Sequence, residues 1–224
     1  MRTFQIMFAP GRALAFVAVL ETLWYGCVHF SRPYWLETST PTVILDKASF
    51  VSISGLLLFT LANHSATLAR GRHAMLMLGS AIPSIAVFEY IGSLAYMHNG
   101  LTPRTHWGAK ATAVYGAAFA ASVLSLLPLS REARRRAMLR EWLFGLVVVA
   151  AVIVASFGYT QITPGATLHV HHWWYAYVLA FFARFETAFS SILSGVLIGI
   201  YVEGVAMSDN LFIIDYQPLA LSPP

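Results

Sequence analysis

Residues 142–159 read WLFGLVVVAAVIVASFGY, an unbroken run of 18 residues without one charged side chain. A membrane-spanning helix needs roughly 20 mostly apolar residues, because the hydrocarbon core is about 30 Å thick and a helix rises about 1.5 Å per residue. Inside a bilayer the backbone finds no water to bond, and a helix satisfies its own N–H and C=O groups. This run therefore predicts a transmembrane helix.

The composition extends that prediction to the whole chain. Of its 224 residues, 58% are hydrophobic and 11% are charged, whereas a soluble domain has about 45–50% and about 25%. The mean hydropathy is +0.65. The formal net charge of +4 comes from basic residues in short segments between apolar runs. That placement indicates contact with lipid head groups and control of membrane orientation, and it argues against a nucleic-acid partner.

Seven apolar runs of this kind, separated by turn-forming residues, predict seven transmembrane helices. We therefore expect an all-α, polytopic integral membrane bundle, with a single transmembrane domain over 1–224 that ends in a surface tail at 208–224. The predicted spans are 13–30, 48–69, 74–97, 111–129, 142–159, 169–183 and 187–207.

The basic residues predict the orientation of the chain. With seven spans, one side carries ten Lys or Arg residues and the other carries four. Because cytoplasmic loops are enriched in Lys and Arg, the richer side, which includes the segment 131–140, is expected to be cytoplasmic. The amino terminus then lies in the cytoplasm and the carboxyl terminus outside. Which membrane this is does not follow from the sequence.

Six of the eight histidines fall on the non-cytoplasmic side of this topology. The densest group is His169, His171 and His172, at the start of the sixth predicted span. Residues three apart share one helix face, so His169 and His172 are expected to be able to hold one ligand together. His98 lies in a loop on the same side, and Asp209 follows the last span.

Three carboxylates lie within predicted spans, namely Glu21, Glu89 and Glu203. An ionisable group in the bilayer is costly and usually faces the bundle interior, where it often marks function. Glu89 and Glu203 fall in the outer halves of their spans and Glu21 lies nearer the middle, so we expect all three to be able to face the histidine group. Of these, Glu89 and Glu203 are the candidate catalytic residues, acting as general acid or base.

A transition metal, either zinc, iron or copper, is one possible ligand of this group. Its predicted ligands are His169, His172, His171, His98 and Asp209, with Glu203 as a further donor. Two other interpretations are open: a site for a polar substrate, lipid or proton, and a plain interfacial belt, since histidines and tryptophans collect at membrane surfaces. The HExxH signature is absent.

Two further features bear on packing. Gly195 and Gly199 form a GxxxG pattern in the last span, which predicts close helix packing inside the bundle or against a membrane protein partner. Arg184 and Glu186 lie in the short turn before that span, where we expect an ion pair.

Three classes of function are consistent with these patterns. The first is a membrane enzyme, metal-dependent or using acid–base groups, that acts on a lipid or another hydrophobic substrate. The second is a non-catalytic subunit or assembly factor of a larger membrane complex. The third is a proton-coupled transporter of small molecules, with the carboxylates and histidines as a relay.

Overall fold

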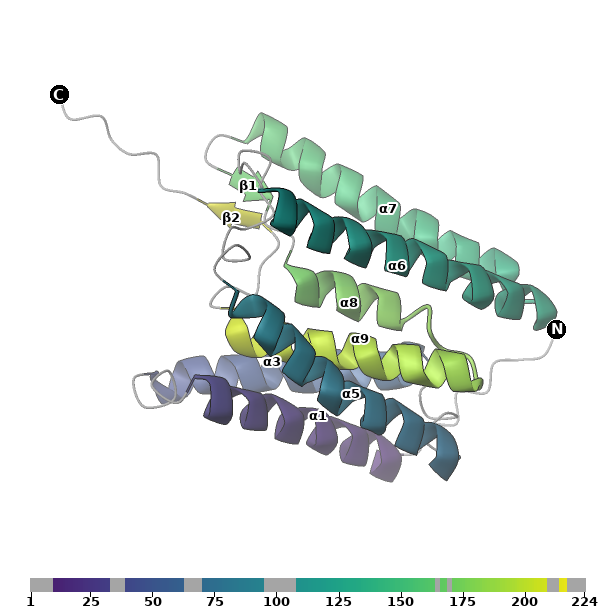
Figure 1. Cartoon of the computed structure of the whole chain (residues 1–224), viewed down its shortest axis with the longest axis horizontal. Coiled ribbons are helices and arrows are strands. Elements are labelled where there is room, and N and C mark those ends of the chain that lie inside the picture. Colours follow the sequence, from purple (N-terminus) through teal and green to yellow (C-terminus); the bar gives the residue numbers. More distant parts are fainter. Residues whose placement is uncertain are drawn as a thin grey trace.

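The computed structural model describes residues 10–32, 39–62, 70–94, 108–163, 166–168, 171–208 and 214–216. Over these residues the chain forms seven helices and one antiparallel pair of short strands (Figure 1). The elements are α1 (Pro10–Ser31), α3 (Pro41–Leu61), α5 (Gly71–Gly92), α6 (Ala109–Arg135), α7 (Leu139–Ile162), β1 (Ala166–Leu168), α8 (His172–Ala180), α9 (Ala188–Met207) and β2 (Ile214–Tyr216).

The structure confirms the predicted helical membrane bundle. Six of its helices, all except α8, are long and apolar enough to cross a bilayer. The sixth predicted span, 169–183, is the exception, because α8 is a helix of only nine residues. Such a helix is about 14 Å long, against a hydrocarbon core of about 30 Å. The structure therefore does not confirm a seventh full spanning helix at this segment, and the exact number of spans remains a prediction.

After α8 the chain continues as irregular backbone over residues 181–187, which runs to the start of α9 (Figure 1). Non-helical backbone at membrane depth is tolerated only where protein covers it and satisfies its polar groups. Phe182, Ala183 and Phe185 are buried. The indole Nε1 of Trp142 donates to the carbonyl oxygen of Phe182 at 3.4 Å, and the Ser194 hydroxyl donates to that of Ala183.

The helices alternate in direction, so their ends gather at two poles. We call the pole that holds the start of α8 and the carboxyl end of α9 the outer end. The turn between α6 and α7 lies at the opposite pole, the inner end, as Figure 1 shows. The non-cytoplasmic location of the outer end remains a prediction.

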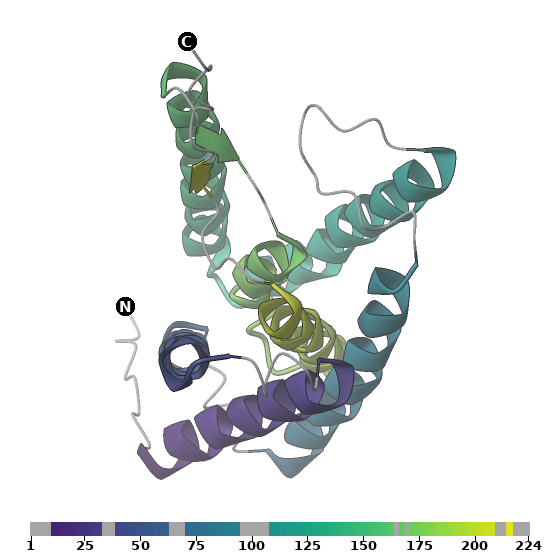
Figure 2. The same cartoon turned by 90° about the vertical axis from the view of Figure 1, so that its left-hand side faces the viewer.

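Helix α9 is the buried centre of the bundle, and Figure 2 shows it among α1, α5 and α8. Its closest neighbour is α5. A Cβ atom on Gly195 would overlap the carbonyl oxygen of Met77, and one on Gly199 would overlap that of Ala81. The GxxxG pattern therefore packs inside this chain, and its face is covered by α5.

Serine hydroxyls on α5 hydrogen-bond to the backbone of α9 across the same contact. Ser80 donates to the carbonyl oxygen of Ile192 at 3.0 Å, and Ser84 donates to that of Val196 at 2.9 Å. Small residues allow the two backbones to approach, and the approach brings these hydroxyls within reach of the neighbouring backbone. The position of α9 is thus fixed over residues 192–199.

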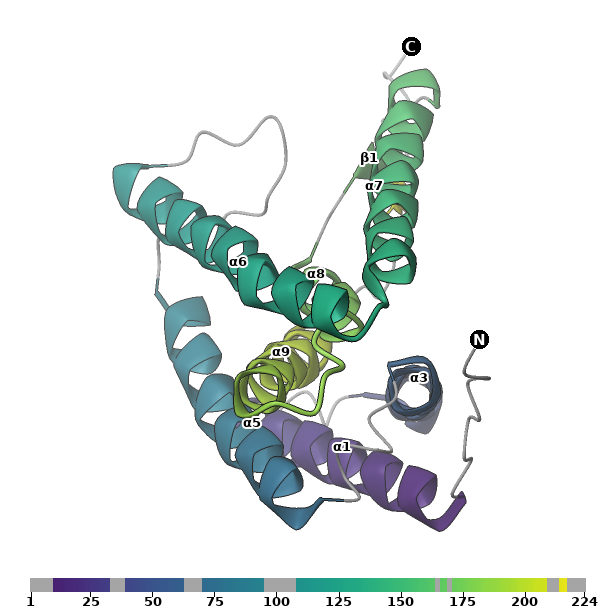
Figure 3. The ribbon, with the colours of Figure 1, turned by 90° about the vertical axis from the view of Figure 1, so that its right-hand side faces the viewer.

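Helices α6 and α7 meet at the inner end and diverge towards the outer end (Figure 3). Their large apolar side chains are mostly exposed, including Phe119 on α6 and Phe144 and Val154 on α7. In a bilayer such a surface contacts lipid chains, which are as apolar as the side chains themselves.

We expect Gly195→Ala to destabilise the protein by about 1–3 kcal/mol, because the added methyl group overlaps the backbone of α5. Gly79→Ala is the matched control, since a Cβ atom on that residue of α5 meets nothing within 4 Å. The free energy of unfolding of both variants in detergent, or their midpoint of thermal unfolding, checks this. Equal effects at the two positions would show that α5 and α9 are not in close contact.

Candidate functional site

The first residue of α8 meets the last turns of α9 at the outer end. The Nε2 atom of His172 lies 2.8 Å from the Oε2 atom of Glu203. Glu203 is buried, with 2% of its surface exposed, whereas the His172 side chain is 44% exposed. The pair therefore joins a carboxylate inside the bundle to an imidazole that is open to the surroundings.

Glycine at position 204 allows this approach. A Cβ atom on Gly204 would lie 2.7 Å from His172 Nε2 and 2.5 Å from the Cβ atom of Trp173. Any side chain here would push the start of α8 away from α9. His171 stands just before the helix with extended backbone, which turns the chain so that His172 begins α8 beside Glu203.

The short contact joins a carboxyl oxygen of Glu203 to a ring nitrogen of His172. When Glu203 is ionised it can only accept hydrogen bonds, so the hydrogen between the two groups is then on Nε2 of His172. In a neutral imidazole the lone pair then lies on Nδ1. A carboxylate that orients a histidine and stabilises its charged form is the arrangement that acid–base catalysis uses.

A second carboxylate, that of Glu89, lies nearby on α5. It interacts electrostatically with Glu203 and Arg32, and the Ser31 side chain at the end of α1 hydrogen-bonds to it. Its Oε2 atom is buried and has no hydrogen-bond partner among the described residues. The ring of Phe88, one residue earlier, stacks on His172 with centroids 6.2 Å apart.

The thiol of Cys27 on α1 also belongs to this group, since it interacts electrostatically with Glu89 and Glu203. Helices α1, α5, α8 and α9 thus each contribute a polar side chain to the outer end. Both predicted catalytic residues, Glu89 and Glu203, lie in this cluster together with His172.

The remaining predicted ligands do not join them within the described part of the chain. The His171 ring stacks on Trp173, with centroids 6.3 Å apart, and so faces a different neighbour from His172. His98, His169 and Asp209 lie outside the described residues. Among the residues that are described, no three His, Cys, Asp or Glu side chains are arranged to hold a metal ion. The metal site remains a prediction.

Glu21 occupies a different contact between helices. Its Oε1 atom accepts a hydrogen bond from the Ser52 hydroxyl on α3 at 2.6 Å. Glu21 therefore does not join His172 as expected, but pairs within the contact between α1 and α3, while His172 pairs with Glu203.

Two cations at the outer end were not predicted as functional residues. Lys47 on α3 is 3% exposed, and its Nζ atom donates to the carbonyl oxygens of Val205 and Ser208. Arg32, which follows α1, donates to the carbonyl oxygen of Met207 at 3.1 Å. Their only signal in the sequence is that each basic residue lies at the edge of an apolar run.

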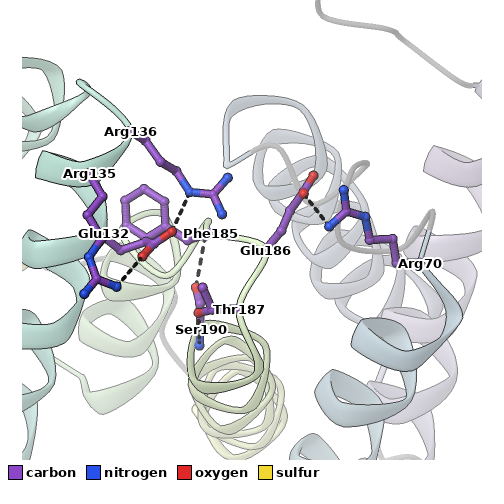
Figure 4. Close-up of polar contacts among 8 residues, drawn as sticks. All are labelled: Arg70, Glu132, Arg135, Arg136, Phe185, Glu186, Thr187 and Ser190. Carbon is purple, nitrogen blue, oxygen red and sulfur yellow. Dashed lines mark hydrogen bonds and ion pairs between the residues drawn. The ribbon is translucent and has the colours of Figure 1, made fainter.

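The ion pairs of the inner end also differ from expectation (Figure 4). Glu186 pairs with Arg70, which precedes α5, at 2.8 Å, so the predicted pair of Arg184 with Glu186 is wrong. Burial lowers the pKa of Arg184, and the Glu141 carboxylate on α7 opposes that shift. The two residues of the segment before α9 have different neighbours: Glu186 contacts Arg70 before α5, and Arg184 lies near Glu141 on α7.

Arginines of the turn between α6 and α7 complete this end of the bundle. Arg136 bonds Glu132 at 2.7 Å and lies over the ring of Phe185, 5.9 Å from its centroid. The backbone N–H of Phe185 donates to the Ser190 hydroxyl, and the Ser190 N–H donates to the Thr187 hydroxyl (Figure 4). These bonds fix the point at which α9 begins.

A double-mutant cycle measures the pair at the outer end. We expect His172→Gln and Glu203→Gln to be coupled by about 1 kcal/mol in the free energy of unfolding, because each single change removes the same hydrogen bond. His172→Gln combined with Glu21→Gln is the control, and these effects should add to within about 0.5 kcal/mol. Additive effects for the first combination would contradict the pairing of His172 with Glu203.

Comparisons with known proteins find no relative of this chain. No family model, no curated protein sequence and no solved structure matches the chain. Its function must therefore be inferred from the geometry of its own residues.

Proposed function

We propose that the chain is a membrane enzyme that uses His172 and Glu203 for acid–base chemistry on a lipid or another hydrophobic substrate at its outer end. The observation that carries this proposal is the asymmetry of the pair, a buried carboxylate bonded to a half-exposed imidazole. A purely structural pair needs no exposed imidazole, whereas a general base must reach its substrate.

Each residue has a distinct role in this proposal. Glu203 orients the neutral ring of His172 so that Nδ1 can accept a proton from a water molecule or from a substrate hydroxyl group. Once His172 has taken up this proton, the Glu203 carboxylate stabilises the charged ring. The oxygen that lost the proton attacks an ester or amide carbonyl carbon of the lipid, and the bond from that carbon to its alcohol oxygen or amine nitrogen breaks. The same Nδ1 atom returns the proton to this departing oxygen or nitrogen. Glu89, with one buried oxygen that has no hydrogen-bond partner among the described residues, is a second group that can hold the proton.

The position of the pair favours a lipid as the substrate. His172 lies at the outer end of the bundle, where the spanning helices end and lipid head groups are expected. The flanking helices α6 and α7 present exposed apolar side chains along their length. A lipid would therefore place its polar reacting group beside His172 and its chains along the apolar surface.

The metal-dependent form of this proposal uses the same histidine. His172 would bind the ion together with His98, His169 or Asp209, and the ion would polarise the substrate or activate water. The acid–base roles of His172 and Glu203 proposed above do not require the ion.

A proton-coupled carrier is the second candidate, and the interrupted crossing at α8 favours it. Transporters commonly bind substrates and ions where a spanning helix is broken. Here the break at residues 181–187 lies on the same crossing as His172. The carbonyl oxygens of Phe182 and Ala183 in this break already accept hydrogen bonds from Trp142 and Ser194. These two oxygens would have to exchange those bonds before they could bind an ion.

The test is a lipid-conversion assay. The full chain is reconstituted into liposomes that contain phospholipids, diacylglycerol and ceramide, and lipid products are followed by mass spectrometry. We expect the wild type to convert one of these lipid classes. His172→Gln and Glu203→Gln should each slow the conversion by about 10²–10⁴-fold, the usual contribution of a general base.

Glu21→Gln is the matched control, because it neutralises another carboxylate that the bundle holds away from the pair. It should leave the rate unchanged. A wild type that converts none of these lipids, or a His172→Gln variant that is as active as the wild type, would contradict the proposal. Dissipation of a pH gradient by liposomes that show no lipid conversion would favour the carrier.

A further inference from the structure

Helix α9 ends at the outer pole, and its end needs hydrogen-bond donors. The last four carbonyl groups of any helix have no partner within the helix. They also carry the negative end of the helix dipole, so a cation placed there is favourable. Glu203 lies within this last stretch of α9, only a few residues before Met207. Whatever holds the end of the helix therefore also determines where Glu203 lies.

Two cations from two other helices supply the donors. The Lys47 Nζ atom reaches the carbonyl oxygens of Val205 and Ser208 from the first turns of α3. Arg32 reaches the carbonyl oxygen of Met207 from the end of α1. Arg32 also interacts electrostatically with Glu89, so one of the two cations faces the second carboxylate.

The burial of Lys47 is unusual for an amine that only caps a helix. Lysine is almost never fully buried unless it is paired, because its ammonium group is costly to remove from water. An exposed lysine reaches head groups by extending its flexible side chain towards water. Lys47 instead lies inside the bundle, where its Nζ atom bonds the carbonyl oxygens of Val205 in α9 and of Ser208 directly after it, 158 and 161 residues further along the chain.

We propose that Lys47 and Arg32 are positioning residues that clamp the carboxyl end of α9 and thereby hold Glu203 against His172. The clamp acts through the backbone of α9 and does not touch His172. It rests on the His172–Glu203 pair of the proposed function, but it does not depend on what the substrate is.

The chain provides its own control, because it has only two lysines and the second, Lys110, is exposed at the start of α6. The experiment measures the coupling of His172→Gln with Glu203→Gln in three backgrounds, namely Lys47→Met, Lys47→Arg and Lys110→Met. We expect the coupling, about fivefold in the unfolding equilibrium, to fall towards onefold in Lys47→Met. It should persist in Lys47→Arg, which keeps a cation, and in Lys110→Met.

A purely structural Lys47 would behave differently. Lys47→Met would then lower overall stability but leave the coupling at its wild-type value, and that result would overturn the proposal. If Lys47→Met does not fold, Arg32→Gln is tested in the same cycle, and undiminished coupling there would overturn it equally.

Labelling of the unmodified protein gives an independent measurement. A water-soluble amine-acylating reagent should modify Lys110 readily and Lys47 at least tenfold more slowly, as followed by peptide mass spectrometry. Equal labelling of the two lysines in the folded protein would also overturn the clamp. Absence of lipid conversion would refute only the proposed function, because neither the coupling nor the labelling involves a substrate.

Discussion

The close approach of α5 and α9 is the contact on which the rest of the structure depends. Gly195 and Gly199 let the backbone of α9 lie against the carbonyl groups of Met77 and Ala81. In a bilayer the hydrophobic effect does not drive helices together, so backbone proximity and hydrogen bonds between helices must do so. With α9 placed in this way, its outer turns bring Glu203 into the cluster at the outer end.

The short helix α8 and the irregular backbone after it are the second constraint. Helix α8 ends at Ala180, well short of a bilayer thickness, and irregular backbone continues from there to the start of α9. That backbone is stable because α7 and α9 cover it and supply donors such as Trp142 and Ser194. Helix α8 begins at His172, beside the last turns of α9. Gly204 of α9 has no side chain there, and any side chain would keep the two helices apart.

Much of the architecture follows from the sequence, because long apolar runs leave few alternatives to spanning helices. The proximity of Glu203 to the start of α8 also follows, since the topology places both at one pole. The length of α8 does not, because an apolar run continues through Phe181 and Phe182 even though the helix has ended. Its end depends on neighbours that satisfy the irregular backbone.

The contacts of Lys47 and Arg32 also cannot be predicted from the sequence, because they depend on which helices pack together. Each joins residues more than 150 positions apart in the chain, and no periodicity marks which face of a helix a lone basic residue occupies. The partner of Glu186 was missed in the same way, since Arg70 belongs to a different turn. Such pairings follow from how helices rotate and pack, which hydropathy alone does not determine.

The proton on His172 is the most direct test of the whole account. Nuclear magnetic resonance of protein with ¹⁵N-labelled histidine, in lipid nanodiscs, distinguishes which ring nitrogen carries the hydrogen, and His172→Gln assigns the signal. The account predicts that neutral His172 carries its hydrogen on Nε2 and that Glu203→Gln weakens this preference. A hydrogen on Nδ1, or a spectrum that Glu203→Gln leaves unchanged, would contradict it.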